Sequence, residues 1–123
     1  MDIEIKWHHY KEDGYVINVK GILDFETRDH FKLTVRDYLE SNQEYLTNNS
    51  KLILDLGEIS YMDVAGFGSL NWLRNRLAVL NAKVEFHVII SPEIERIFEI
   101  ARAQKTMNVY GSLQDAYCAI FST

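Results

Sequence analysis

Residues 52–80 constrain the fold of this chain more than any other stretch. They begin with Leu-Ile-Leu-Asp-Leu, an apolar run interrupted only by Asp55, which is typical of a strand buried on both faces of a sheet. A turn-like segment follows at 57–61. The stretch therefore predicts a buried strand, a loop and then a helix. The apolar residues that recur at helical spacing are Phe67, Leu70, Leu73, Leu77 and Leu80.

Asp63 lies at the junction, and it is predicted to cap the helix because its carboxylate can accept from backbone N–H groups two or three residues on. Val64, Ala65 and Gly66 would form the first turn. The free N–H groups and the positive dipole end there favour an anion or an acidic partner. Gly66 and Gly68 have no Cβ, so another surface can approach closely. Two interpretations stay open: a binding surface, or a capped core helix whose glycines fit tightly against neighbouring elements.

The remainder of the chain predicts the order ββαβαβαβα. Alternating residues on either side of Asp13-Gly14 predict an antiparallel pair of strands. Strands separated by helices imply parallel pairing, so we expect an α/β fold with a mixed sheet of about five strands and about four helices on one side of it. Asp24 is a candidate N-cap for the first helix, and Ser91 for the third. Segments with a strand pattern are 3–7, 15–19, 84–90 and 107–110, and segments with a helical pattern are 31–39, 94–101 and 113–120.

Length and composition favour one folded domain over 1–123, because 47% of the 123 residues are hydrophobic. The formal net charge of −5 argues against nucleic acid and against an anionic membrane surface as partners. Cys118 is the only cysteine, so an internal disulfide is excluded, which suits a reducing compartment. No apolar run approaches the length of a membrane span, and the first residues lack the apolar segment of a signal peptide. We expect a cytoplasmic protein without direct membrane insertion.

Motifs for catalysis and for metal binding are missing from the sequence. No nucleophile motif, phosphate-binding glycine loop, GxGxxG, CxxC or HExxH is present. His8 and His9 are adjacent, so in a strand they point to opposite faces and cannot share a metal. Asp55 and Asp63 do not suggest an acid/base pair, because Asp55 lies within the buried run. We expect no enzyme activity, no catalytic residue, no metal and no cofactor.

Several motifs resemble the STAS family, the sulfate transporter and anti-sigma factor antagonist domains. The family pattern is roughly LDLSGVxFxDSSGLGxLL, and this chain reads LDLGEISYMDVAGFGSLNWL. A second resemblance is GILD at 21–24, which is similar to the family's GxLD segment, and a third is SLQDA at 112–116, which is similar to its SLxxA ending. Bacterial antagonists carry a phosphorylated serine or threonine just before the motif glycine. That position is Ala65 here, and Val64 replaces the serine before it.

The resemblance implies a bacterial interaction module for signal transduction and transcription regulation. Its partner would be an anti-sigma factor, often a serine kinase-type protein, and binding would release a sigma factor. Ala65 has no hydroxyl, so the usual phosphorylation switch cannot operate there; Ser60 or Ser69 could replace it, or none. The partner-binding residues implied are Asp24, Asp63, Val64, Ala65, Gly66, Gly68 and Ser69.

Some alternatives remain open from the sequence alone. The same surface could bind a membrane transporter as an accessory subunit, or the start of the helix could bind a nucleotide or another small anion. Asp24 is either a helix cap or part of the interface. The polar, asparagine-rich segment 41–50 reads as a loop that either carries function or is a tolerated insertion, with Tyr45 and Leu46 as its contacts to the body of the domain. The oligomeric state is not indicated.

Overall fold

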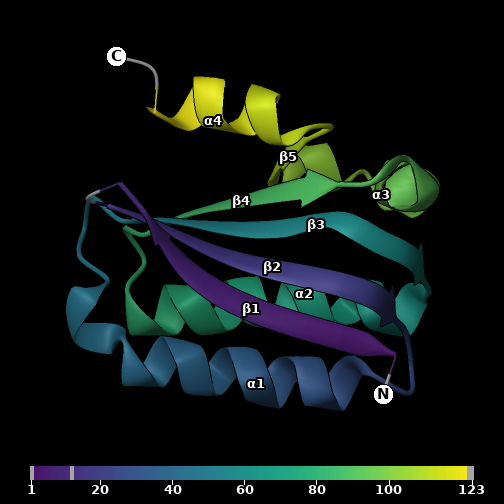
Figure 1. Cartoon of the computed structure of the whole chain (residues 1–123), viewed down its shortest axis with the longest axis horizontal. Helices are drawn as coiled ribbons and strands as arrows, with labels where there is room; N and C mark the ends of the chain where they lie inside the picture. Colours follow the sequence, from purple (N-terminus) through teal and green to yellow (C-terminus); the bar gives the residue numbers. More distant parts are fainter. Residues whose placement is uncertain (1, 12, 122–123) are drawn as a thin grey trace.

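The computed structural model describes residues 2–11 and 13–121, and within them five strands form one sheet in the order β1-β2-β3-β4-β5 (Figure 1). β1 and β2 pair antiparallel, whereas the other neighbours pair parallel. The predicted mixed sheet of an α/β fold is therefore confirmed. The strands are β1 (Ile3–Tyr10), β2 (Gly14–Leu23), β3 (Lys51–Met62), β4 (Glu85–Ile90) and β5 (Asn108–Tyr110).

β1 and β2 form the predicted hairpin, and Asp13 lies in the turn, but Gly14 is already the first residue of β2 and pairs with Tyr10. The Nζ atom of Lys51 is 3.0 Å from the Asp13 carboxylate, and the Lys51 N–H donates to the Asp13 carbonyl at 2.8 Å. The start of β3 is therefore tied to the hairpin. The domain expected over 1–123 also includes four residues outside the described ones, namely Met1, Glu12, Ser122 and Thr123.

Helices α1 (Arg28–Ser41) and α2 (Val64–Leu80) cover one face of the sheet, below it in Figure 1. α3 (Glu95–Ile100) follows β4, and α4 (Leu113–Phe121) follows β5. The predicted order ββαβαβαβα is confirmed. Among the described residues, no helix is both long and apolar enough to cross a membrane. Short 3-10 turns occupy Gln43–Tyr45, Pro92–Ile94 and Ala103–Lys105.

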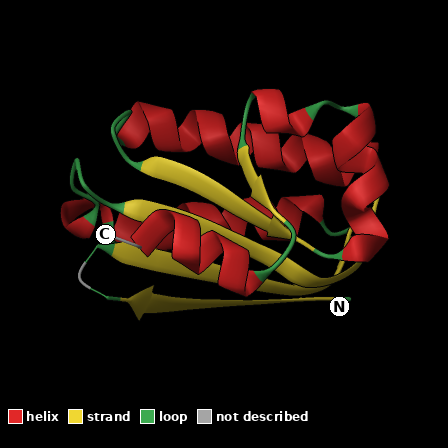
Figure 2. Ribbon diagram, turned by 90° about the horizontal axis from the view of Figure 1, so that it is seen from above, coloured by secondary structure: helices red, strands yellow, loops and turns green. Residues whose placement is uncertain are grey.

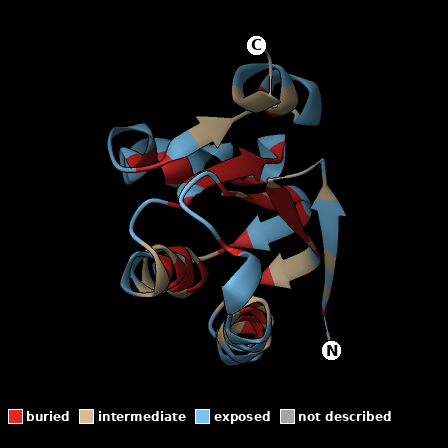
Figure 3. Ribbon diagram, turned by 90° about the vertical axis from the view of Figure 1, so that its left-hand side faces the viewer, coloured by how far each residue is buried: buried red, intermediate tan, exposed pale blue. Residues whose placement is uncertain are grey.

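The main core lies between the sheet and the α1–α2 layer, as the burial colouring of Figure 3 shows. Phe67 of α2 meets Phe98 of α3 edge to face, with ring centroids 5.1 Å apart, so α3 extends the same core. Burial of these apolar faces is the main source of stability in a domain of this size. The core residues of α1 and α2, none more than 2% exposed, are Phe31, Val35, Leu39, Leu70, Leu73 and Leu77.

Helix α4 covers the opposite face of the sheet, which Figures 1 and 2 show from two directions. A second apolar cluster forms there from Val16, Ile53, Ile89 and Ala116, with Tyr10, Tyr110, Tyr117, Ile120 and Phe121 around it. The expectation that the helices lie on one side was therefore wrong for α4. The unbroken apolar run at 52–56 already indicated a strand buried on both faces, and α4 supplies the second cover.

β3 runs on to Met62, so the turn expected at 57–61 is wrong. β2 is long enough to continue pairing, and the register shifts by one residue between Asn18–Asp55 and Lys20–Glu58. Asp55 stabilises this bulge: its carboxylate accepts from the Gly57 N–H at 2.9 Å and from the Asn18 amide at 3.3 Å. β4 stops pairing at Leu56, at the bulge, so among the described strands only β2 pairs with the second half of β3.

The helix starts predicted at Asp24 and Ser91 have different outcomes. α1 begins at Arg28, and Asp24 caps the turn that leads into it: its carboxylate accepts from the Glu26 and Thr27 N–H groups at 3.0 and 3.1 Å, and its carbonyl accepts from the Arg28 N–H at 2.9 Å. Ser91 makes no cap bond, because its buried hydroxyl donates to the Ile59 carbonyl at 2.6 Å, beyond the end of the β3–β4 ladder. At the last helix, the Ser112 hydroxyl accepts from the Asp115 N–H at 3.1 Å and so caps the start of α4.

The segment 41–50 is attached to the body of the domain at its middle, through Tyr45 and Leu46. Leu46 is 5% exposed, and its carbonyl accepts from the Asn81 side chain at the end of α2. The Tyr45 side chain is exposed, although its carbonyl accepts from the Tyr15 hydroxyl at 3.0 Å. Leu46 therefore anchors the segment through its side chain, and Tyr45 does so only through its backbone.

Candidate functional site

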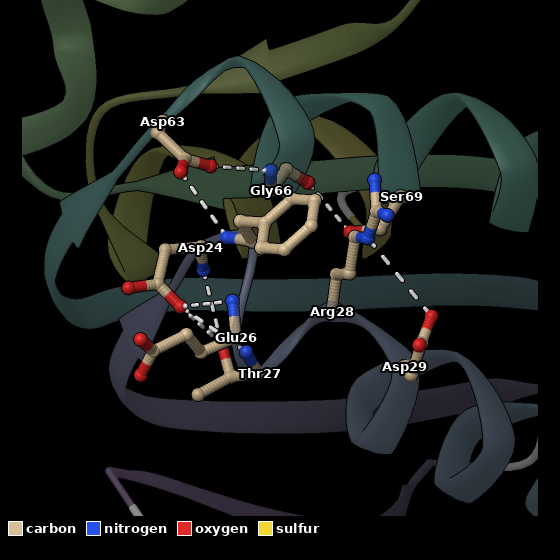
Figure 4. Close-up of polar contacts among 9 residues, drawn as sticks. Asp24, Glu26, Thr27, Arg28, Asp29, Asp63, Gly66 and Ser69 are labelled. Atoms are coloured by element: carbon tan, nitrogen blue, oxygen red, sulfur yellow. Dashed lines mark hydrogen bonds and ion pairs between the residues drawn. The ribbon is translucent and has the colours of Figure 1, made fainter.

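Asp63 is the N-cap of α2, as predicted. Its backbone is extended, with φ −107° and ψ −176°, and one carboxylate oxygen accepts from the Gly66 N–H at 2.7 Å (Figure 4). The Phe67 N–H donates to the Asp63 carbonyl at 2.9 Å, which starts the helical ladder. The cap places a fixed negative charge at the positive end of α2. An added anion would meet that charge, which weakens the interpretation of this helix end as a small-anion site.

The second oxygen of Asp63 reaches the segment between β2 and α1. It accepts from the Phe25 N–H at 3.1 Å. Asp24 immediately precedes Phe25 in the chain. Its carboxylate points away from Asp63 and accepts from the Glu26 and Thr27 N–H groups at 3.0 and 3.1 Å (Figure 4). Asp24 and Asp63 therefore lie on adjoining segments, and Phe25 is the residue that joins them.

The two glycines of α2 have different surroundings. A Cβ on Gly66 would come within 2.0 Å of the Leu23 carbonyl oxygen, so α2 crosses the end of β2 closely only because this residue lacks a side chain. A Cβ on Gly68 would meet no atom within 4 Å, and Gly68 is exposed. The tight-packing interpretation therefore holds for Gly66, whereas Gly68 leaves a bare patch on the surface.

The two serines considered as alternative modification sites differ in accessibility. Ser69 is fully buried, and its hydroxyl donates to the Gly66 carbonyl at 2.5 Å. Its side chain therefore does not reach the surface of the folded domain. Ser60 is exposed on β3 and donates to the Gly21 carbonyl at 3.2 Å.

An apolar surface surrounds the start of α2, and part of it was missed from the sequence. Val64 is 81% exposed, Phe25 64% and Tyr61 55%. All three are close to Asp63: Val64 follows it, Tyr61 precedes it by two residues, and Phe25 bonds to it. We call Phe25, Tyr61, Val64, Ala65 and Gly68 the α2 amino-terminal surface. Strand alternation from buried Ile59 would turn Tyr61 inward. A second shift in the β2–β3 register, between Gly21–Ile59 and Ile22–Tyr61, leaves Tyr61 exposed and Met62 buried, so the sequence pattern gave no signal for it.

Charged groups border this surface. The Arg28 guanidinium lies 4.4 Å from the centroid of the Phe25 ring, and its Nε is 4.0 Å from the Asp29 carboxylate (Figure 4). Glu26 is exposed beside them. Among residues 2–11 and 13–121, no group of three His, Cys, Asp or Glu side chains could hold a metal ion. An exposed apolar surface with a charged border is suited to binding another protein.

The fold and the site define a small α/β domain built around a capped, exposed helix start beside a GxLD-type turn. The STAS domain model matches residues 6–116. The chain belongs to the STAS domain family.

Solved structures of similar fold extend this result. An anti-sigma factor antagonist from Mycobacterium paratuberculosis is 19% identical, with 96% of this chain and 93% of that chain covered and a TM-score of 0.79. The anti-sigma factor antagonist SpoIIAA of Bacillus, in its unphosphorylated form, is 13% identical over 98% of both chains, with a TM-score of 0.69. The murine Solute Carrier 26 family member A9 anion transporter is 18% identical, with 94% of this chain but 19% of the transporter covered and a TM-score of 0.71. At these identities the likeness concerns the fold.

Proposed function

We propose that this chain is an interaction regulator of the anti-sigma factor antagonist type, which binds an anti-sigma factor or a related serine kinase-type protein through the α2 amino-terminal surface. The observation that carries the proposal is the Asp63 carboxylate, which holds the Phe25 segment beside the exposed first turn of α2. Apolar side chains from three segments are thereby presented together. The other predicted interface residues support this surface through hydrogen bonds beneath it: Asp24, Asp63, Gly66 and Ser69.

The second part of the proposal is that binding lacks the usual phosphorylation switch. SpoIIAA is known in unphosphorylated and phosphorylated forms. In this chain Ala65 and Val64 stand at the corresponding positions, and neither has a hydroxyl. The nearest hydroxyl on the same helix, that of Ser69, is buried. Binding is therefore constitutive at this site and is regulated by the amount of protein or by competitors.

The test is a titration of the chain with purified anti-sigma factors encoded in the same genome, followed by calorimetry. The variant Ala65→Asp should weaken binding roughly thirtyfold or more, because it buries an unpaired charge in the interface. Ala78→Asp, at an exposed alanine near the other end of α2, is the matched control and should bind like the original chain. Equal affinity of both variants would mean that this surface is not the interface.

Folding does not confound this comparison. In the first turn of α2 an aspartate is favourable to the helix dipole, so Ala65→Asp should unfold at the same denaturant concentration as the original chain or slightly above it. A second variant, Ala65→Ser, restores a hydroxyl at the position that the family phosphorylates. Incubation with a kinase-type partner and ATP should add one phosphate to Ala65→Ser and none to the original chain, as measured by intact mass.

A pull-down and a calorimetric titration distinguish the proposed function from the two alternatives, a transporter accessory subunit and a small-ligand sensor. A tagged pull-down from the source cells that returns a transporter subunit, and no anti-sigma factor, would replace the proposed partner. A heat signal with nucleotides alone would favour the sensor. A phosphate on Ser60 of the original chain would show that the switch has moved to β3.

A further inference from the structure

β1 leaves one edge of the sheet open. It pairs with β2 along its eight residues, and no strand within residues 2–11 and 13–121 pairs with its other side. Figure 3 shows this N-terminal strand along the exposed border of the sheet. The opposite edge strand, β5, has only three residues. Natural proteins shorten, bend or charge edge strands because their unpaired groups bind other strands. The shortness of β5 protects that edge from pairing with another strand, whereas β1 is long and regular.

The backbone of β1 has a definite orientation toward that edge. The Ile22 N–H donates to the Asp2 carbonyl at 2.7 Å, and the β1–β2 register places these residues opposite each other. In an antiparallel pair, hydrogen-bonded and non-hydrogen-bonded positions alternate. Asp2 and every second residue after it therefore direct their backbone groups to β2. Ile3, Ile5 and Trp7 direct theirs to the open edge.

The side chains of β1 alternate in the same way. Ile3 belongs to the main core, and Ile5 and Trp7 pack against it from the α1 side. On the other face, Glu4, Lys6 and His8 are exposed, and Glu4 and Lys6 carry opposite charges. The Glu4 and Lys6 side chains are 60% and 70% exposed and approach to 4.0 Å within the strand. Such an exposed pair adds little to the stability of one copy, so both charges are available to a partner strand.

We propose that this chain forms a homodimer in which β1 pairs antiparallel with β1 of a second copy, with Ile5 opposite Ile5 at the two-fold axis. Ile3 then lies opposite Trp7, and all of these residues direct backbone groups to the open edge. Glu4 lies opposite Lys6, and Asp2 lies opposite His8. The two five-stranded sheets join edge to edge.

Charge selects this register over its neighbours. An axis at Lys6 would place Lys6 opposite Lys6, and an axis at Glu4 would place Glu4 opposite Glu4. An axis at Trp7 would pair Lys6 with His8 and Glu4 with Tyr10. With the axis at Ile5, Glu4 and Lys6 pair in both directions, at non-hydrogen-bonded positions where side chains are closest. Opposite charges facing each other stabilise strand pairs, and like charges destabilise them.

The dimer does not depend on the proposed function, because no residue of β1 belongs to the α2 amino-terminal surface. Its test is sedimentation equilibrium of the full chain over a range of concentrations, which should show a monomer–dimer equilibrium. Glu4→Lys and Lys6→Glu should each weaken dimerisation about tenfold or more, because each creates two symmetry-related pairs of like charge. Lys83→Glu, at an exposed position after α2, makes the same change in charge as Lys6→Glu and should leave the dimer unchanged.

Mixing supplies the decisive measurement. In an equimolar mixture of Glu4→Lys and Lys6→Glu chains, every facing pair at positions 4 and 6 has opposite signs, so a heterodimer should form with at least the original affinity. The doubly exchanged chain, Glu4→Lys with Lys6→Glu, should also dimerise again. Circular dichroism of each variant verifies the fold. A chain that stays monomeric up to about 1 mM, or a dimer that these exchanges do not affect, would overturn the proposal.

Discussion

The carboxylate of Asp63 and the backbone N–H of Phe25 form a hydrogen bond of 3.1 Å between residues 38 positions apart in the sequence. The same carboxylate caps α2 through Gly66. One side chain therefore sets both where α2 begins and where the segment after β2 lies. The α2 amino-terminal surface exists because these two bonds are made together.

Replacement of Asp63 should separate its two roles. Asp63→Ala removes both acceptors and should lower the free energy of unfolding by about 1–2 kcal/mol. Asp63→Asn keeps an acceptor for the Gly66 N–H, but its amide cannot also accept from the Phe25 N–H, so its loss should be smaller. Urea denaturation followed by tryptophan fluorescence measures both. Equal losses for the two variants would show that the bond to Phe25 contributes the whole effect.

The glycines of α2 should respond to the same substitution with opposite signs. Gly66→Ala forces a Cβ against the Leu23 carbonyl and should destabilise the domain by about 1–3 kcal/mol. Gly68→Ala enters open space within a helix and should stabilise it by about 0.5–1 kcal/mol. Thermal and chemical denaturation of the two variants measure this difference. A loss of stability in Gly68→Ala would contradict the open surroundings of that position.

Two serine hydroxyls each donate to a backbone carbonyl, but their contributions to the free energy of unfolding should differ because only one of them is buried. Ser91 is 2% exposed and donates to the Ile59 carbonyl, so Ser91→Ala leaves that carbonyl without its partner and should cost about 1–3 kcal/mol. Ser60 is exposed, and water replaces its bond to the Gly21 carbonyl. Ser60→Ala should therefore change the free energy of unfolding by no more than about 0.5 kcal/mol. Denaturation midpoints that rank the two variants the other way would contradict this account.

His87 should make stability depend on pH. It is 5% exposed, with its ring nitrogens 3.1 Å from the Tyr110 hydroxyl and 3.0 Å from the Glu85 carboxylate. Burial lowers the pKa of His87 below its ordinary value of 6.5, and this outweighs the opposing effect of Glu85. The unfolded chain therefore binds a proton at a higher pH than the folded chain does.

The expected direction follows from that difference. As the pH falls from 6.5 toward the lowered pKa of folded His87, the free energy of unfolding should decrease, whereas above 6.5 the contribution of His87 is constant. Urea denaturation at about pH 7.5 and about pH 5.5 measures the loss. His87→Gln should reduce that loss, and His30→Gln, which removes an exposed imidazole from α1, is the control. An undiminished loss in His87→Gln would assign the pH dependence to other groups.

Local patterns were sufficient for much of the site. Asp63 was predicted as a cap because capping depends on residues two or three positions away, and the GxG segment was correctly placed in the first turns of α2. Phe25 was not recognised, because its position depends on a bond to a residue far away in the sequence. Ser69 was one of two serines that could replace the missing modification site, and only the packing of α2 against the sheet shows that it is buried.

The sequence by itself determined the order of strands and helices, the β1–β2 hairpin and the cap at Asp63, because each depends on periodicity or on hydrogen bonds between near neighbours. The tertiary structure decided the length of β3, since β2 supplies its hydrogen-bond partners as far as Met62. It also decided that α4 covers the second face of the sheet. The apolar face of α4 predicts that this helix is buried against another element. Its position is decided by the side chains of Val16, Ile53 and Ile89, which lie on the face of the sheet that α1 and α2 do not cover.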